Sequence, residues 1–257
     1  MKHTSYLTTI FFCFVSLYGH SQSYTPVEQK IKMGKTLVNA WVVSLENESL
    51  DDLKDEWTAY VKESLDVKVK KQSRSELVAK KILAPRIYHL TGDLRAMFFS
   101  EHDRSSIAVA FMSGYDLSLN SVDHPREAGN LRHFTQQFIK TYKTDQITDL
   151  LEEEEKRERS LESEYERHER ERTQLVKHIA RVDRKLNSSK VDEGKRFELK
   201  NEKVTTESKV RALDEIMSNY TVELGQIKQV IQRYRADLQQ LNALFAEPLA
   251  DQPAHRR

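Results

Sequence analysis

Cysteine is almost absent from this sequence, which has 257 residues and a single cysteine, Cys13. Because Cys13 lies in a segment that we expect to be removed, the mature chain would contain no thiol. That excludes disulfide bonds, thiolate metal sites and a cysteine nucleophile. A domain without such crosslinks must be stabilised by its hydrophobic core alone.

Glycine, proline and an excess of either charge are also scarce. Seven glycines and five prolines leave little room for long flexible linkers. Without residues 1–21, which contain one lysine and no acid, the 41 basic residues become 40 and equal the 40 acidic residues. We therefore predict no nucleic-acid partner, since no basic excess remains to bind phosphate.

Long hydrophobic runs are limited to one, which lies at the N-terminus. A short basic start, Met1 to His3, precedes a mostly apolar run of thirteen residues, Tyr6–Tyr18, and small residues at Gly19 and Ser21. This pattern predicts a signal peptide over residues 1–21, since about 20 residues are needed to span a membrane. The alternative is a retained N-terminal anchor. We expect an exported chain, periplasmic or extracellular, without a membrane span after cleavage.

Residues 22–143 have the pattern of a small α+β domain. Alternating apolar positions predict a five-stranded, largely antiparallel sheet with helices on one face. The expected strands are 37–45, 66–71, 76–84, 93–100 and 106–112, with a lead-in over 24–35 that could add a short strand. Strand 37–45 is apolar on both faces, with Leu37 on the same face as Trp41, and should lie centrally. We expect Thr91-Gly92 to turn the chain into the hairpin of the last two strands, whose loop would be residues 101–105.

Two helices are predicted in the same domain. Ser49 and Asp52 have the spacing of a capping box, and an apolar stripe from Leu50 to Leu65 should lie on the sheet. Pro125 suits the first position of the second helix. No glycine or proline follows Tyr142 until Gly194, so this helix should continue as the first arm of a coil.

Residues 144–246 carry a coiled-coil pattern. Eleven consecutive apolar positions at alternating steps of three and four run from Val210 to Phe245. The first arm has a weaker seam with polar residues at Glu154, Glu158, His168 and Arg172. A polar break near 187–195 favours an antiparallel hairpin folded about residues 192–193. The alternative is one helix of about 120 residues that dimerises in parallel. The tail, 247–257, is predicted to be disordered.

Several clusters could carry chemistry, and each has a structural interpretation. Glu101, His102 and Asp103 with Asp123 and His124 could supply metal ligands or a general base, although their spacing matches no metal motif. Ser113-Gly114-Tyr115 faintly resembles a nucleophile turn but lacks G-x-S-x-G, so Gly114 is expected to provide a positive φ or a close backbone approach. His168 and Arg172 could set the register or respond to pH, or could form a loosely packed, solvated segment. We predict no catalytic, cofactor-binding or metal-binding residue and no cofactor.

The chain resembles a family of uncharacterised exported proteins of gram-negative bacteria. The resemblance is carried by Ala110–Asp116 with Asp123-His124-Pro125, and by the tryptophan-containing helix Leu53–Tyr60. It implies a signal peptide, a small α/β domain and a C-terminal charged coiled coil. It implies no activity that could be assigned to a residue.

These patterns together predict a non-enzymatic scaffold or spacer in the cell envelope. Its partner would be a protein that the sequence does not identify, and two copies could pair through the coil. One alternative is a periplasmic holdase, which would need exposed apolar surface near the polar hairpin tip. Another is an envelope hydrolase whose site would lie on the α+β domain.

Overall fold

The computed structural model describes residues 24–101, 104–114 and 117–246. These divide into two compact units, residues 1–139 and residues 140–257. In chain order the elements are β1 (Val27–Met33), β2 (Thr36–Glu46), α1 (Leu50–Leu65), β3 (Lys70–Lys71), β4 (Glu76–Ala84), β5 (Tyr88–Glu101), β6 (Arg104–Gly114), β7 (Leu117–Ser118), α2 (Pro125–Leu186) and α3 (Glu193–Ala246). The predicted signal peptide and tail lie outside the described residues.

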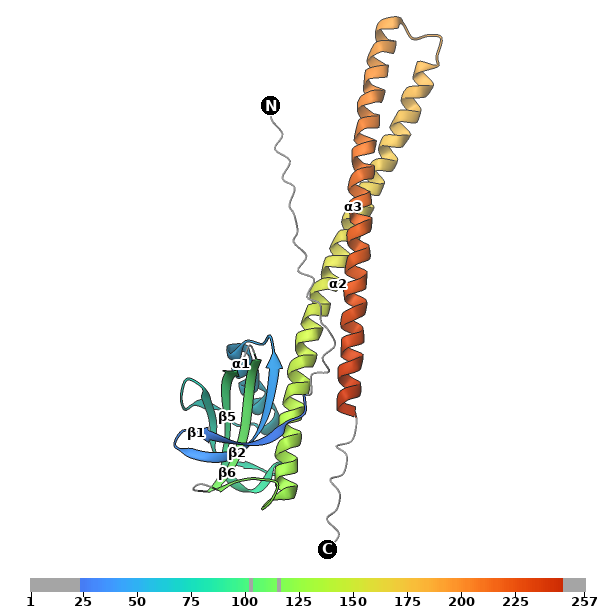
Figure 1. The fold of residues 1–257 in the computed structure, drawn as a ribbon. Coiled ribbons are helices and arrows are strands. Elements are labelled where there is room, and N and C mark those ends of the chain that lie inside the picture. Colours follow the sequence, from blue (N-terminus) through green and yellow to red (C-terminus); the bar gives the residue numbers. More distant parts are fainter. Residues whose placement is uncertain (1–23, 102–103, 115–116, 247–257) are drawn as a thin grey trace. The chain divides into compact units, whose positions relative to one another are not determined.

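The first unit contains an antiparallel sheet with the strand order β1-β2-β6-β5-β4-β3, and β7 pairs with β6 (Figure 1). The predicted α+β class is therefore confirmed. The described sheet has seven strands rather than the five expected, because β1 is a full strand and β7 adds a two-residue bridge. The strand predicted over 66–71 is wrong in extent: only Lys70–Lys71 reach β4, since α1 ends at Asp66 in a left-handed conformation.

Helices α1 and α2 cover one face of this sheet with aromatic side chains. Ser49 caps α1 as predicted, with its hydroxyl accepting the amide hydrogens of Asp51 and Asp52. Trp57 of α1 is 1% exposed, and its ring meets the edges of Phe134 and Phe138 of α2 at 5.9 and 5.0 Å. These contacts join the two helices within the first unit.

The opposite face of the sheet has a second apolar cluster. Its buried members are Met33, Val38, Ala40, Val42, Ala108, Ala110 and Met112. This explains why strand β2 is apolar on both sides, and β2 lies between β1 and β6 as expected for a central strand. Leu37 is nevertheless 63% exposed, because β2 pairs with β6 only from Trp41 onward.

Gly92 is not a turn residue, contrary to the expectation for Thr91-Gly92. It lies inside β5 and pairs with Ile82, while the connection from β4 passes through residues 85–87. A Cβ at position 92 would come within 2.3 Å of Phe111 Cε1 and 2.5 Å of the Met112 carbonyl oxygen. The glycine is therefore required by the close approach of β6, not by a turn.

We expect Gly92→Ala to lower the free energy of unfolding by about 1–3 kcal/mol, because the added methyl group overpacks the sheet against Phe111. A urea titration followed by tryptophan fluorescence measures this change. Gly129→Ala is the matched control: no atom lies within 4 Å of its added Cβ in helix α2. That control should raise stability by about 0.5–1 kcal/mol. Equal effects of the two substitutions would contradict this explanation of Gly92.

The second unit is an antiparallel hairpin of α2 and α3, as predicted (Figure 1). The chain turns over residues 187–192, where the Asp192 carboxylate accepts the amide hydrogen of Lys195 at 2.8 Å. Side-chain pairs between the arms confirm the predicted register. Asp183–Lys203, Arg172–Asp214 and Glu158–Lys228 are all centred on residue 193.

Apolar residues of the α3 seam are buried along the hairpin. They are Leu199, Leu213, Ile227, Ile231 and Leu241. Helix α2 contributes fewer buried residues to the same seam, in keeping with the polar positions in its pattern. The parallel single-helix alternative does not describe this chain, because α2 and α3 pack as the arms of one hairpin.

Candidate functional site

Glu101 and His124, described members of the two histidine–acid clusters singled out in the sequence, lie far apart. Glu101 ends β5, whereas the His124 ring lies 6.3 Å from that of Tyr88, the first residue of the same strand. At about 3.3 Å per residue, the fourteen residues of β5 separate these ends by roughly 40 Å. His102 and Asp103 lie outside the described residues. Because Glu101 pairs with Arg104, the expected five-residue loop is reduced to residues 102–103.

Asp123 and His124 serve the start of α2. The His124 amide donates to the Asn120 carbonyl at 3.1 Å, and its own carbonyl accepts the Ala128 amide hydrogen at 2.8 Å. The His124 ring stacks edge-on against Tyr88, and its Nδ1 is buried without a hydrogen-bond partner. These contacts match the structural interpretation of the pair, in which it begins a helix.

The Ser113-Gly114 segment does not form a nucleophile turn in the described residues. Both residues belong to β6, and the Ser113 hydroxyl donates to the Leu117 carbonyl at 3.4 Å. Gly114 has neither the positive φ nor the close approach that we expected, since a Cβ there would meet no atom within 4 Å. Tyr115 lies outside the described residues.

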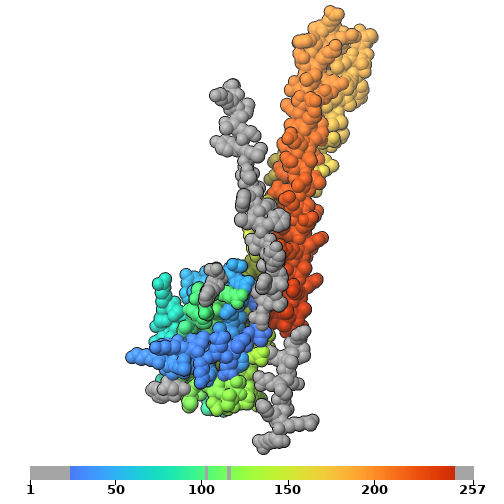
Figure 2. Space-filling view, in the orientation of Figure 1, coloured from blue at the N-terminus to red at the C-terminus, as the bar shows by residue number. Residues whose placement is uncertain are grey.

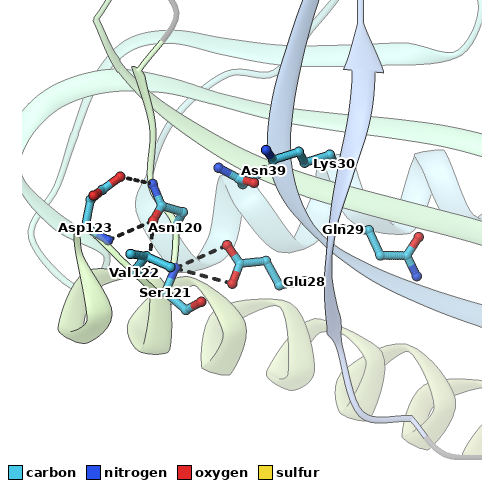
Figure 3. Close-up of a pocket in the computed structure, with 8 residues that line it drawn as sticks. All are labelled: Glu28, Gln29, Lys30, Asn39, Asn120, Ser121, Val122 and Asp123. Carbon is cyan, nitrogen blue, oxygen red and sulfur yellow. Dashed lines mark hydrogen bonds between the residues drawn. The ribbon is translucent and has the colours of Figure 1, made fainter.

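The first unit contains an open polar crevice of about 430 Å³ (Figure 3). It lies between the strands β1 and β2 and the loop that precedes α2. Its lining residues are Glu28, Gln29, Lys30, Asn39, Asn120, Ser121, Val122 and Asp123. The sequence analysis did not single out the residues from β1 and β2, because only long-range pairing brings them to this loop.

Hydrogen bonds connect the polar groups on the loop side of the crevice. Asn120 Oδ1 accepts the amide hydrogens of Val122 and Asp123 at 2.9 and 2.8 Å, and its Nδ2 donates to Asp123 Oδ2 at 2.8 Å. Both oxygens of Glu28 accept the Ser121 amide hydrogen, at 3.1 and 3.3 Å (Figure 3). The Asn-x-x-Asp spacing before Pro125 is the sequence signal that indicates such a turn.

The hydrogen bonds of the crevice therefore stabilise the loop before α2, and the rest of the crevice is an open polar surface. Its one serine, Ser121, has no histidine among the residues that line the crevice with it. Across residues 24–101, 104–114 and 117–246, no three His, Cys, Asp or Glu side chains are grouped to hold a metal ion. The polar lining of the crevice has the donors and acceptors to bind a small hydrophilic ligand.

We expect Asn120→Ala to destabilise the first unit by about 1–2 kcal/mol, because two amide hydrogens and the Asp123 carboxylate lose their partner. Chemical denaturation followed by tryptophan fluorescence measures the loss. Val122→Ala, at a side chain that is 85% exposed, is the control and should change stability by less than about 0.5 kcal/mol. An Asn120 variant as stable as this control would show that the loop does not depend on the asparagine.

Polar pairs join the two arms of the hairpin along its length. Glu155–Arg235 at 2.7 Å and Arg157–Glu223 at 2.6 Å lie near the middle of α2, and His178–Glu202 at 2.8 Å lies nearer the turn. Each pair is partly exposed and contributes little alone, but together they favour one register. The acidic run beginning at Glu152 is therefore partly an inter-arm surface, not only a water-facing one.

His168 packs inside the hairpin seam. Its ring stacks on Tyr220 of α3 with centroids 5.8 Å apart, and its side chain is 14% exposed. Its Nδ1 lies 3.7 Å from Glu171 Oε2, and Arg172 points instead to Asp214. The interpretation of this stretch as merely solvated is wrong for His168, because the ring is packed between the arms.

Hydrogen bonds between the arms raise several pKa values. The Lys203 ammonium donates to Asp183, which raises the pKa of Lys203, and the Tyr220 hydroxyl donates to Glu164, which raises the pKa of Tyr220. The bond from Lys228 to Glu162 raises the pKa of Lys228 in the same way. Each group thus holds its proton more firmly in the folded hairpin than in the unfolded chain.

Because these pKa values are raised on folding, we expect the hairpin to lose stability at alkaline pH. The contribution is complete below the unfolded pKa values, about 10 for tyrosine and 10.4 for lysine, and is lost as pH rises through the raised folded values. The melting temperature followed by circular dichroism should therefore fall between about pH 10 and pH 12. The combination of Lys203→Met, Tyr220→Phe and Lys228→Met should flatten this dependence. A wild-type melting temperature that rises over that interval would contradict the assignment.

No helix in the described ranges is long and apolar enough to cross a membrane. Comparison with known protein families, with characterised proteins and with solved structures finds no match to this chain. The resemblance to exported proteins with a C-terminal coiled coil therefore stays a prediction.

Proposed function

We propose that this chain is an exported, non-enzymatic interaction protein of the cell envelope whose helical hairpin acts as a scaffold or spacer. The observation that carries the proposal is the hairpin. Helices α2 and α3 contain 62 and 54 residues, and forty residues of one arm reach about 60 Å at 1.5 Å per residue. Such a length presents far more surface than the stability of a small domain requires.

The polar crevice supports the non-enzymatic part of the proposal. Its carboxylates and amides brace a loop, and Glu101 and His124 lie at opposite ends of β5. The signal-peptide pattern over residues 1–21 supports export to the periplasm or the cell exterior.

Site-specific photo-crosslinking in the native envelope tests this proposal. A photoreactive residue at Arg159, an exposed position of α2, should give discrete crosslinked partners that mass spectrometry can identify. The same probe at Leu83, which is 60% exposed in the first unit, is the matched comparison. Recovery of the chain from the cytoplasm, or absence of any crosslink from the hairpin, would count against the proposal.

A periplasmic holdase is the second candidate. It is favoured by an exposed apolar side chain close to the polar turn, Phe197 at 67%, with Val176 at 43% about three helical turns before the turn on α2. The polar segment expected at the tip, Asn187 to Lys195, is thus followed two residues later by an exposed phenylalanine. Suppression of client aggregation at stoichiometric amounts, lost in Phe197→Ser, would favour the holdase over the scaffold.

An envelope hydrolase with its site on the α+β domain is the third candidate, although the separation of Glu101 from His124 along β5 counts against a single site that uses both clusters. Replacing His102 and His124 simultaneously should abolish such an activity, whereas a scaffold should keep its crosslinking pattern.

A further inference from the structure

The outward side of α3 has an unusual composition. Seam residues of α3 recur at steps of three and four and face α2. At 100° per residue, the residue two places before a seam residue is rotated about 200° from it and therefore lies on the side away from α2. These outward positions are 197, 201, 204, 208, 211, 215, 218, 222, 225, 229, 232, 236, 239 and 243. Only Arg211 and Glu215 among these fourteen are charged.

The equivalent side of α2 is quite different. Its outward positions, two places before each seam residue, are 145, 149, 152, 156, 159, 163, 166, 170, 173, 177, 180 and 184. Nine of these twelve residues are charged, as expected for a helix face in water. Because both arms belong to one hairpin, the contrast indicates that the outward side of α3 is adapted to a partner.

Exposed apolar residues lie on this same side of α3. Phe197, Val204 and Val222 are 67%, 58% and 61% exposed, and they are separated by seven and eighteen residues. These separations are close to two and five whole helical turns, so the three side chains form one line along α3. We call the outward positions from Phe197 to Gln229 the α3 stripe. The orange part of α3 lies at the surface of the hairpin in Figure 2.

The central part of the α3 stripe, from Val204 to Val222, is complementary to itself when reversed about residue 213, whereas at its ends Phe197 falls opposite Gln229. Val204 then matches Val222, Ser208 matches Ser218, and Arg211 matches Glu215. The only two charges of the stripe thus become two opposite-charge pairs, and the exposed valines meet each other. The serines are small enough to let two helices approach closely. An unrelated partner would not require this symmetry, whereas a two-fold pair of identical helices does.

We propose that α3 pairs antiparallel with α3 of a second copy of this chain through the α3 stripe. The two-fold axis passes near residue 213 of each copy, and the surface differs from the α2–α3 seam within each hairpin. A single helix pair is at the small end of protein interfaces, so the dimer forms reversibly with concentration. This inference rests on α3 alone and does not depend on the proposed export or scaffold role.

A charge-reversal series measured by sedimentation equilibrium tests the pairing. Arg211→Glu places a glutamate opposite Glu215 of the other copy in both symmetric pairs. Glu215→Arg likewise places an arginine opposite Arg211 in both pairs. Each should weaken the dimer at least about tenfold, because like charges then face each other twice. The double variant Arg211→Glu/Glu215→Arg restores both pairs and should return the dissociation constant to within about threefold of wild type.

Apolar variants give a second readout. Val204→Asp should leave the chain monomeric at concentrations where wild type dimerises, while its helix content by circular dichroism stays unchanged. Val176→Asp removes an exposed valine of α2 outside the stripe and should leave the dimer intact. A monomeric wild-type chain would overturn the proposal, as would a dimer insensitive to all stripe variants. Envelope crosslinks from the stripe to another protein, without self-association, would overturn it in favour of that partner.

Discussion

Replacing Ile231 with aspartate is expected to melt the hairpin at a temperature more than about 10 °C below that of the wild type. Ile231 is 3% exposed in the α3 seam, one turn from the Arg235–Glu155 pair. A carboxylate there loses its water, and the nearby Arg235 is already paired with Glu155, so the substitution costs about 3–5 kcal/mol. Helix α2 also presents Glu154 and Glu158 in this part of its seam, and both would repel the new charge.

The neighbouring position supplies the control for this substitution. Gln232→Asp adds the same charge at an exposed site on α3, and its melting curve at 222 nm should be nearly unchanged. If the Ile231→Asp variant had the same melting temperature as the control, the seam would not hold the arms together, and the hairpin would need another source of stability.

Replacing Trp57 with alanine should destabilise the first unit by about 3–5 kcal/mol. The indole is 1% exposed and meets Phe134 and Phe138 edge-on, so its removal leaves a cavity between α1 and α2. That loss is a large share of the 5–15 kcal/mol by which domains are typically stable. Trp41, the other tryptophan, reports the transition in a urea titration.

Trp57→Phe is the matched variant, because it keeps an aromatic ring while reducing the volume. It should recover more than half of the stability lost in Trp57→Ala. A loss below about 1 kcal/mol for Trp57→Ala would mean that the surrounding side chains collapse into the cavity without cost.

Local patterns predicted most of the fold. Ser49 begins α1 and Pro125 begins α2 because capping and proline geometry depend on a few neighbouring residues. The seam from Val210 to Phe245 predicted a packed helix because its periodicity extends over many turns. The polar break after Leu186 then favoured the hairpin over one continuous helix, and the inter-arm pairs bear this out.

Long-range contacts account for what the sequence did not predict. Gly92 resembles a turn residue until β6 places the Phe111 ring against it. Strands β3 and β7 have two residues each, too few to show an alternating pattern. Glu28 reaches Ser121 across 93 positions of the chain, and no local signal marks that partner.

The polar centre of α2 has a consequence for local opening. Between Tyr142 and Val182, which are 3% and 1% exposed, no residue of α2 is fully buried. Amide hydrogens are protected in proportion to the free energy needed to expose them. Backbone deuteration should therefore proceed fastest within residues 152–172 and slowest near these two anchors. Such a hairpin is held by buried residues at both ends of one arm and opens locally between them.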